Sequence, residues 1–442
     1  MNIVQLTPGA GGMYCGNCFR DNALVARLRQ QGHDTLMLPL YLPMTLEDAD
    51  QSAGAPIFFS GVSVYLEQKS ALFRHMPDWL HKWLASPKVL KWAAGRAAKT
   101  RATDVGELAL SMMRGEEGNQ ARELDELVGW LKTNHRPDVI TLSNALLVGL
   151  VRRLKTELGA PVVITLQGED AFLDAMSEPH RSAAWQLLSE RSRDVDCFIA
   201  PSRYFAELMT RRLKLNPRRV RVVYNGISLD GFEETRNGEH GTRNETTPVL
   251  GFFARMCRDK GLDLLVDAYL EIRRRNRVPN LKLHIGGGMG PSDEPFVAQL
   301  KAQLAAANVL GEVQFFPNVD RATKLSFFKS LSVFCTPALY GEAFGLYVIE
   351  ALAAGVPVVQ PRSAAFPELI EATGGGLIRE PSAVALADGI EELLLNPARA
   401  RSLGDAGRAA VREHFSIEQM ATKTVEVYGE LIAERGRATA HV

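Results

Sequence analysis

Two carboxylates, Glu342 and Glu350, lie on either side of Phe344–Tyr347. The sequence of this segment is typical of the start of a helix. The first N–H groups of a helix have no acceptor within it, so this opening could present backbone amides to an anion. Glu350 would lie about one turn into the helix, where its carboxylate could accept both hydroxyls of a ribose. Glu342, in the loop before the helix, could face a sugar ring. The alternative is two solvated acids that the helix dipole favours there.

Two cations have a comparable setting earlier in the chain. Arg255 and Lys260 lie in GFFARMCRDKG, between a predicted strand at Val249–Ala254 and a predicted helix at Leu262–Arg275. An arginine fork and a lysine point charge beside a helix N-terminus would suit a diphosphate. The alternative is solvated surface charge, which is where most Arg and Lys side chains are found.

Two glycine-rich segments also follow predicted strands. Thr7–Gly16 (TPGAGGMYCG) would let the backbone approach an anion at a helix N-terminus, although it is neither a Walker loop nor a strict G-x-G-x-x-G. Gly286–Gly288 would let a flat ligand such as a base or ribose lie against the backbone. For both segments, the alternative is a turn that binds nothing.

The cysteines and histidines do not predict a metal site. Cys15 and Cys18 supply half of a tetrahedral zinc site, and the sequence has no second C-x-x-C to complete it. We expect no bound metal, and we interpret this cysteine pair as structural or ligand-shaping rather than redox-active.

The elements that must position these residues alternate between short apolar runs and longer amphipathic stretches. This alternation indicates an α/β fold with parallel sheets covered by helices on both faces. Glu233–Thr247 lacks large apolar side chains and is typical of a linker, while residues 60–120 fit the alternation poorly and are interpreted as a helical insertion. We predict two doubly wound, Rossmann-like lobes, 1–230 and 231–415, whose strand ends face a shared cleft. The predicted strands are Ile3–Leu6, Val139–Leu142, Val162–Leu166, Val220–Tyr224, Val249–Ala254, Leu281–Ile285, Val313–Phe316, Leu331–Cys335 and Pro357–Val359.

Composition narrows the class of protein. The 442 residues include 51 basic and 51 acidic side chains, so no global field favours nucleic acid as a partner. Five cysteines, the absence of a signal-peptide pattern and the absence of a membrane-length apolar run predict a cytoplasmic protein. The basic stretch Lys82–Arg101 is interpreted as a solvated helix face. Peripheral contact with the anionic inner face of a membrane is the alternative.

Taken together and in order, these motifs resemble the family-4 retaining glycosyltransferases of the GT-B fold. The Glu342-x7-Glu350 segment followed by ALAAGVPVV carries most of the resemblance, and residues 61–76 faintly resemble the first lobe of bacterial glycogen synthases. The resemblance implies that a C-terminal helix, 416–442, packs back on the first lobe. Further matches are the glycine loop at Gly11-Gly12, QQGHD at Gln30–Asp34, RPDVI at Arg136–Ile140, VVYNGIS at Val222–Ser228, GFFARMCRDKG, the GGG turn and FPELIE at Phe366–Glu371.

The resemblance assigns roles to individual residues. Arg255 and Lys260 would hold the donor diphosphate and neutralise its growing charge, and Glu342 would contact the donor sugar. Asn225 would sit on the hinge side of the cleft. The residues that would bind the donor are Gly11, Gly12, Gly287, Phe344, Gly345, Leu346, Tyr347 and Glu350.

The chain departs from the family pattern in its first lobe. Many relatives have a histidine after the strand that corresponds to Val162–Leu166, where this chain has Gln167. Histidines that follow the aspartate of the PDV motif, here Asp138, are also common in relatives, and in this chain those places hold Thr141 and Ser143. Gln167, Glu169, Asp170 and Asn225 are the first-lobe candidates for contacts with the acceptor or donor sugar. A buried loop with ordinary hydrogen bonds is the alternative, above all for Glu169.

The implied reaction transfers a sugar from a nucleotide-diphosphate sugar to an acceptor hydroxyl, on a glycan, lipid or small molecule, with retention and without a divalent metal. Two alternatives stay open. One is a GT-B nucleotide-sugar epimerase. The other is a catalytically altered relative that binds a nucleotide sugar or glycan without turnover. The sequence does not identify the nucleotide, the sugar, the acceptor or the oligomeric state.

Overall fold

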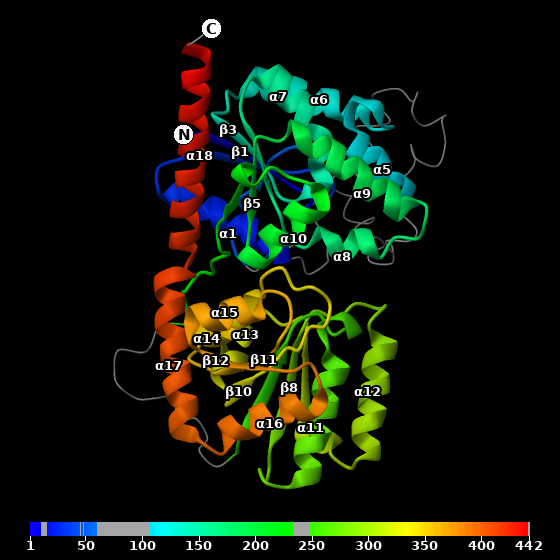
Figure 1. Ribbon diagram of the computed structural model, residues 1–442, viewed down its shortest axis with the longest axis vertical. Helices are drawn as coiled ribbons and strands as arrows, with labels where there is room; N and C mark the ends of the chain where they lie inside the picture. Colours follow the sequence, from blue (N-terminus) through cyan, green and yellow to red (C-terminus); the bar gives the residue numbers. More distant parts are fainter. Residues whose placement is uncertain (10–15, 45, 47, 60–105, 233–246, 441–442) are drawn as a thin grey trace. The chain divides into compact units, whose positions relative to one another are not determined.

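The computed structural model describes residues 1–9, 16–44, 46, 48–59, 106–232 and 247–440 (Figure 1). The chain divides into two compact units, Met1–Val223 with Met420–Val442, and Tyr224–Gln419. Each unit contains a six-stranded parallel sheet, which confirms the predicted α/β class. The loop residues 10–15, the stretch Lys82–Arg101 and residues 61–76 lie outside the described residues.

The first unit has the strand order β2-β1-β3-β4-β5-β6. Every residue of β3, β4 and β5 is buried, because helices cover both faces of a doubly wound sheet. Their sequences are accordingly mostly apolar, without alternation between apolar and charged residues. The elements are β1 Asn2–Thr7, α1 Gly16–Gln30, β2 Asp34–Pro39, α5 Gly106–Arg114, α6 Ala121–Asn134, β3 Val139–Leu142, α7 Val151–Leu158, β4 Val162–Thr165, α8 Glu169–Asp174, α9 His180–Arg191, β5 Cys197–Ala200, α10 Arg203–Leu213 and β6 Val220–Val222.

The second unit has the strand order β12-β11-β10-β7-β8-β9. The chain enters at β7 and then builds the sheet in both directions, with β8 on one side and β10 on the other. In such sheets ligands bind outside the carboxyl ends of the strands at this switch point. The elements are β7 Val249–Phe253, α11 Leu262–Arg275, β8 Lys282–Gly287, α12 Glu294–Ala306, β9 Val313–Pro317, α13 Arg321–Lys329, β10 Val333–Phe334, α14 Leu346–Ala353, β11 Val358–Pro361, α15 Phe366–Thr373, β12 Gly376–Arg379, α16 Ala383–Leu394, α17 Pro397–His414 and α18 Ile417–Ala440, the last of which belongs to the first unit from Met420 on.

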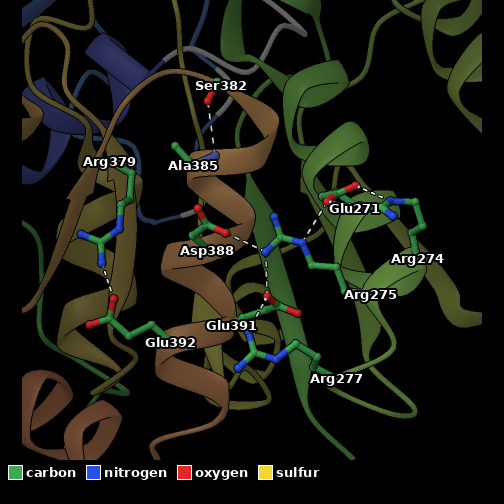
Figure 2. Close-up of polar contacts among 10 residues, drawn as sticks. All are labelled: Glu271, Arg274, Arg275, Arg277, Arg379, Ser382, Ala385, Asp388, Glu391 and Glu392. Carbon is green, nitrogen blue, oxygen red and sulfur yellow. Dashed lines mark hydrogen bonds and ion pairs between the residues drawn. The ribbon is translucent and has the colours of Figure 1, made fainter.

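An ionic network ties α11 to α16 in the second unit (Figure 2). Arg275, near the end of α11, contacts Asp388 at 2.6 Å and the buried Glu391 at 2.8 Å, and it also pairs with Glu271 of its own helix. A buried carboxylate needs such a partner, because an unpaired charge in a protein interior is costly. Among the described residues, no helix is long and apolar enough to cross a membrane.

Candidate active site

Arg255 leaves the carboxyl end of β7 and is held by an acid that follows β8. Its Nε lies 3.1 Å from Asp293 Oδ2 and its Nη2 lies 3.0 Å from Asp293 Oδ1. The Arg255 side chain is 60% exposed, whereas that of Asp293 is 6% exposed. A buried carboxylate therefore anchors one edge of the guanidinium and leaves much of the cation open to an anionic ligand.

Lys260 and Glu342 are direct partners. Lys260 ends the short 3-10 turn Arg258–Lys260, and its Nζ lies 2.5 Å from Glu342 Oε2. The Tyr347 hydroxyl donates to the same oxygen at 2.7 Å. Burial alone would lower the pKa of Lys260, but the adjacent carboxylate outweighs it and holds this pKa above its usual value. Burial would raise the pKa of Glu342, yet Lys260 and these hydrogen bonds keep it below its usual value. Both groups are therefore charged at neutral pH.

Glu350, the second acid of the motif, is paired with a residue that the sequence analysis does not single out. Lys324 on α13 places its Nζ 3.1 Å from Glu350 Oε1. The Lys324 side chain is 6% exposed and that of Glu350 is 15% exposed. The carboxylate is thus held at the edge of the interior, with part of its surface accessible.

The start of α14 has the predicted form. Gly345 is the N-cap residue with φ of 98°, a left-handed conformation that favours glycine. The Phe344 side chain is buried and packs against Tyr224 and Phe415, so only its backbone could meet a ligand. The Phe344 amide already donates to Glu342. Leu346 and Tyr347 form the first helical positions, where backbone N–H groups lack intrahelical acceptors.

The GGG turn has a structural reason of its own. Gly287, with φ of 119°, ends β8, and a Cβ there would lie 2.0 Å from the carbonyl oxygen of Ala254. Asn318 fixes the turn: its amide side chain accepts from Met289 N at 2.9 Å and donates to Met289 O at 2.8 Å. Gly290 N donates to Asp293 Oδ2 at 2.9 Å, so the turn and the anchor of Arg255 are joined.

In the first unit, the candidates after β4 form a clamp of backbone hydrogen bonds. Glu169 is buried, and its two oxygens accept from Ala145 N at 2.7 Å and Gln167 N at 2.9 Å. It therefore joins the segments that follow β3 and β4, as the structural alternative expected. Burial raises the pKa of Glu169 to about 7, against the effect of these amides. Burial also raises the pKa of the neighbouring Asp170, which is itself buried.

Three candidates need separate placement. Asn225, grouped above with the first lobe, lies in the second unit, because the compact units divide just before Tyr224. It is buried and precedes Gly226, whose backbone packs closely on that of Ser416. Gly11 and Gly12 lie outside the described residues.

The structure also identifies polar residues that sequence reasoning missed. Asp21 on α1 is fully buried, pairs with Arg20 at 2.7 Å, and accepts hydrogen bonds from Thr7 and Ser143 at the carboxyl ends of β1 and β3. Asp293, Lys324 and Asn318 were missed in the same way. Asp21 and Lys324 lie within helices, Asp293 caps α12 and Asn318 follows β9, and the sequence carries no motif that marks any of them. Pairing the candidate cations with the candidate acids of the sequence analysis would not have identified these four residues.

The architecture and the charged residues at the strand ends define the class of protein first. Solved structures that share this two-sheet GT-B fold include sucrose-phosphate synthase from Thermosynechococcus elongatus, with a TM-score of 0.70, 18% identity and coverage of 98% of this chain and 100% of that one. The HepE protein of Anabaena in complex with UDP gives a TM-score of 0.68, with 16% identity and coverage of 97% and 100%. At these identities the likeness establishes the fold.

The sequence comparisons then establish the family. The family model described as Glycosyltransferase Family 4 matches residues 108–230, and the model described as Glycosyl transferases group 1 matches residues 234–410. A phosphatidyl-myo-inositol mannosyltransferase from Mycobacterium leprae is 32% identical over 266 residues, which cover 58% of this chain and 68% of that protein. The chain belongs to the family-4 glycosyltransferases of the GT-B fold.

Other relatives are matched over a smaller share of their own length. The phosphatidyl-myo-inositol mannosyltransferase of Mycobacterium tuberculosis is 32% identical over 48% of this chain and 54% of its own length. The D-inositol 3-phosphate glycosyltransferase of Streptomyces griseus is 29% identical over 56% of each chain. The chain therefore spans about half the length of these two relatives.

Proposed function

We propose that this protein is a retaining hexosyltransferase that moves a sugar from a nucleoside-diphosphate sugar to the hydroxyl of an acceptor. The observation that carries the proposal is a set of three opposite-charge pairs in the second unit, Arg255–Asp293, Lys260–Glu342 and Lys324–Glu350. Each includes a residue to which the family motifs assign donor binding. The charges are oriented before any ligand binds, which is the condition for electrostatic stabilisation at low reorganisation cost.

Each pair supplies a different contact. Arg255, anchored on one edge by Asp293, would offer its exposed N–H groups to the diphosphate. Lys260, which pairs with Glu342 in the free protein, would also donate a hydrogen bond to the leaving phosphate. Glu350 would accept hydrogen bonds from the ribose hydroxyls, and the amides at Leu346 and Tyr347 would meet phosphate oxygens.

The proposed reaction needs no carboxylate nucleophile. The bond between the anomeric carbon and the diphosphate oxygen breaks, and the acceptor oxygen bonds to that carbon from the same face. The acceptor proton passes to an oxygen of the departing diphosphate. Arg255 and Lys260 stabilise the negative charge that develops on the leaving group. Glu342 would hold hydroxyls of the donor sugar in place.

The nature of the donor is a proposal supported by neighbours. HepE has been solved with UDP and with UDP-glucose, and several relatives are named as mannosyltransferases. We therefore propose a hexose carried by UDP or by another nucleoside diphosphate. The acceptor would carry a free hydroxyl, and Gln167 and Asp170 are the first-unit candidates for contacting it.

Binding is tested first. Thermal shifts with UDP, GDP, ADP and their glucose and mannose conjugates are measured on the wild type and on Lys260→Ala. A ligand at a hundred times its Kd should stabilise the protein by about 2.7 kcal/mol. One nucleotide should shift the wild type, and the shift should shrink in the variant. No shift with any of these ligands would contradict the proposal.

Turnover and stereochemistry are tested next. The donor that binds is incubated with inositol, lipid and oligosaccharide acceptors, and proton NMR reads the anomeric configuration of the product. Retention and full activity in EDTA are expected. An inverted product would refute the retaining mechanism, and loss of activity in EDTA would refute the metal-free one. Donor binding without transfer to any acceptor would favour the binding-only alternative, and a free altered sugar would favour an epimerase.

A further inference from the structure

Lys324 is a charged side chain in an unusual place. It lies in the middle of α13, a helix that Asp320 caps, and is followed by the partly buried Leu325. Only 6% of the Lys324 side chain is exposed. Lysine is among the residues least often buried, because removing an ammonium group from water is costly unless it is paired. Glu350 of α14 provides a pairing carboxylate, with Nζ 3.1 Å from Oε1.

Packing alone is a weak reason for this pair. An apolar pair of similar volume in such a place is often as stable as a buried ion pair, or more so, because two ions need not be desolvated. What the ion pair does provide is orientation. With Oε1 fixed by Lys324, the Glu350 carboxylate is restrained in one rotamer. Glu350 is 15% exposed, so the restrained group can still be reached by a ligand.

The position of Glu350 connects this restraint to the ligand. It lies in the helix that Gly345 caps, five residues beyond the cap, and the same stretch contains Tyr347, which contacts Glu342. We propose that Lys324 is a positioning residue that orients the Glu350 carboxylate for the ribose hydroxyls of the donor nucleotide. This inference rests on the proposed function, because it takes the nucleotide-binding role of Glu350 from it.

The test measures discrimination between ribose and deoxyribose. Isothermal titration gives the Kd of the nucleoside diphosphate that binds, among UDP, GDP and ADP, and of its 2′-deoxy and 3′-deoxy analogues. A lost hydrogen bond to a charged acceptor should weaken binding of the wild type to at least one analogue by about tenfold or more. In Lys324→Met this ratio should fall to within about twofold of unity, because the carboxylate is no longer held.

Two variants serve as controls. Lys324→Arg retains a cation and should keep the wild-type ratio. Lys329→Met alters an exposed lysine at the end of the same helix and should also keep it. A merely structural role of Lys324 would weaken binding of the nucleotide and of its deoxy analogues by the same factor. That outcome, with the ratio unchanged in Lys324→Met, would overturn the inference.

The variant could lose its fold, so a milder change is measured in parallel. Lys324→Gln keeps a neutral donor toward Glu350 and should reduce the ratio by about threefold or more. An unchanged ratio in Lys324→Gln would overturn the inference even if Lys324→Met does not fold. Failure of the proposed function looks different, because then the wild type binds none of the three nucleotides. A wild type that binds but does not discriminate would refute the ribose role of Glu350 and this inference with it.

Discussion

The ammonium nitrogen of Lys260 lies 2.5 Å from Oε2 of Glu342, and Tyr347 donates to that same oxygen. The cation proposed to receive the diphosphate and the acid proposed to hold the sugar therefore neutralise each other in the free protein. A donor that binds here must share Lys260 with Glu342. This shared contact determines whether removing the charge of Glu342 strengthens or weakens binding of the nucleoside diphosphate.

Glu342→Gln should improve binding of the nucleoside diphosphate while it impairs transfer. Removing the negative charge releases Lys260 to the diphosphate, so its Kd should fall by about three- to tenfold. Turnover should drop by about a hundredfold, because a sugar contact is lost and the position of Lys260 is no longer fixed. Titration calorimetry and initial rates measure the two quantities separately.

Lys260→Met is the matched comparison for this pair. It leaves Glu342 charged next to the diphosphate and should weaken both binding and turnover. Binding that weakens equally in Lys260→Met and Glu342→Gln would contradict the idea that the two groups compete.

Glu169→Gln should change how the stability of the first unit depends on pH. In the unfolded chain this carboxyl ionises near its usual pKa of 4.5, whereas in the folded protein burial raises the pKa to about 7. Between these values the unfolded state releases its proton first, so the contribution of Glu169 to stability decreases as pH rises. The loss amounts to about 3 kcal/mol across this window. The Gln variant lacks a titrating group and should not show it.

Tryptophan fluorescence reports the unfolding of the first unit, to which Glu169 belongs. All five tryptophans lie between positions 79 and 185, within the chain of the first unit. Urea unfolding at pH 4.5 and pH 7.5 should give a stability difference between wild type and Glu169→Gln that shifts toward the variant at the higher pH. A difference independent of pH would show that the pKa of Glu169 in the folded protein is not raised above its value in the unfolded chain.

Arg275→Met should destabilise the second unit. The buried Glu391 would lose its closest partner, and breaking a buried pair by removing one ion costs about 3 kcal/mol. Arg274→Met is the control, because Arg274 is 73% exposed and exposed pairs contribute about 0–1 kcal/mol. Urea unfolding followed by far-UV circular dichroism should show an early transition for Arg275→Met only. The fluorescence transition of the first unit should stay in place.

The sequence predicted strands best where burial makes the local signal unambiguous. β3 begins and ends at the predicted residues, since all four of its side chains are buried and three of them, all but Thr141, are apolar. β2 (DTLMLP) and β12 (GLIR) were not predicted, because a charge, a proline or a glycine weakens their local signal, and β5 (CFIA) was missed although it is as long and as buried as β3. Pairing with neighbouring strands defines them instead.

The candidate site divides in the same way. Arg255, Lys260, Glu342 and Glu350 could be predicted, because chain spacing places each one just beyond a strand or at a helix start. Their partners could not all be predicted. Asp293 is 38 residues from Arg255, and Lys324 is 26 residues from Glu350. Only the fold brings such residues together, and nothing in their local sequence distinguishes them from surface charges.

Asp293→Ala should weaken nucleotide binding through Arg255 and not by direct contact. Asp293 contacts two parts of the site. It fixes the guanidinium of Arg255, and it accepts a hydrogen bond from the backbone N–H of Gly290 in the GGG turn. Without it Arg255 must be ordered by the ligand, and the Kd of the nucleoside diphosphate should rise by about tenfold. Ser292→Ala, which removes only a 3.3 Å contact with Arg255, should change the Kd by less than about twofold.

Titration calorimetry on Asp293→Ala and Ser292→Ala checks this prediction, with Arg255→Ala as reference. If Arg255 acts only through its anchored geometry, Asp293→Ala should cause most of the loss seen in Arg255→Ala, and the double variant should bind no more weakly than Arg255→Ala alone. Additive losses would show instead that Asp293 acts independently of Arg255.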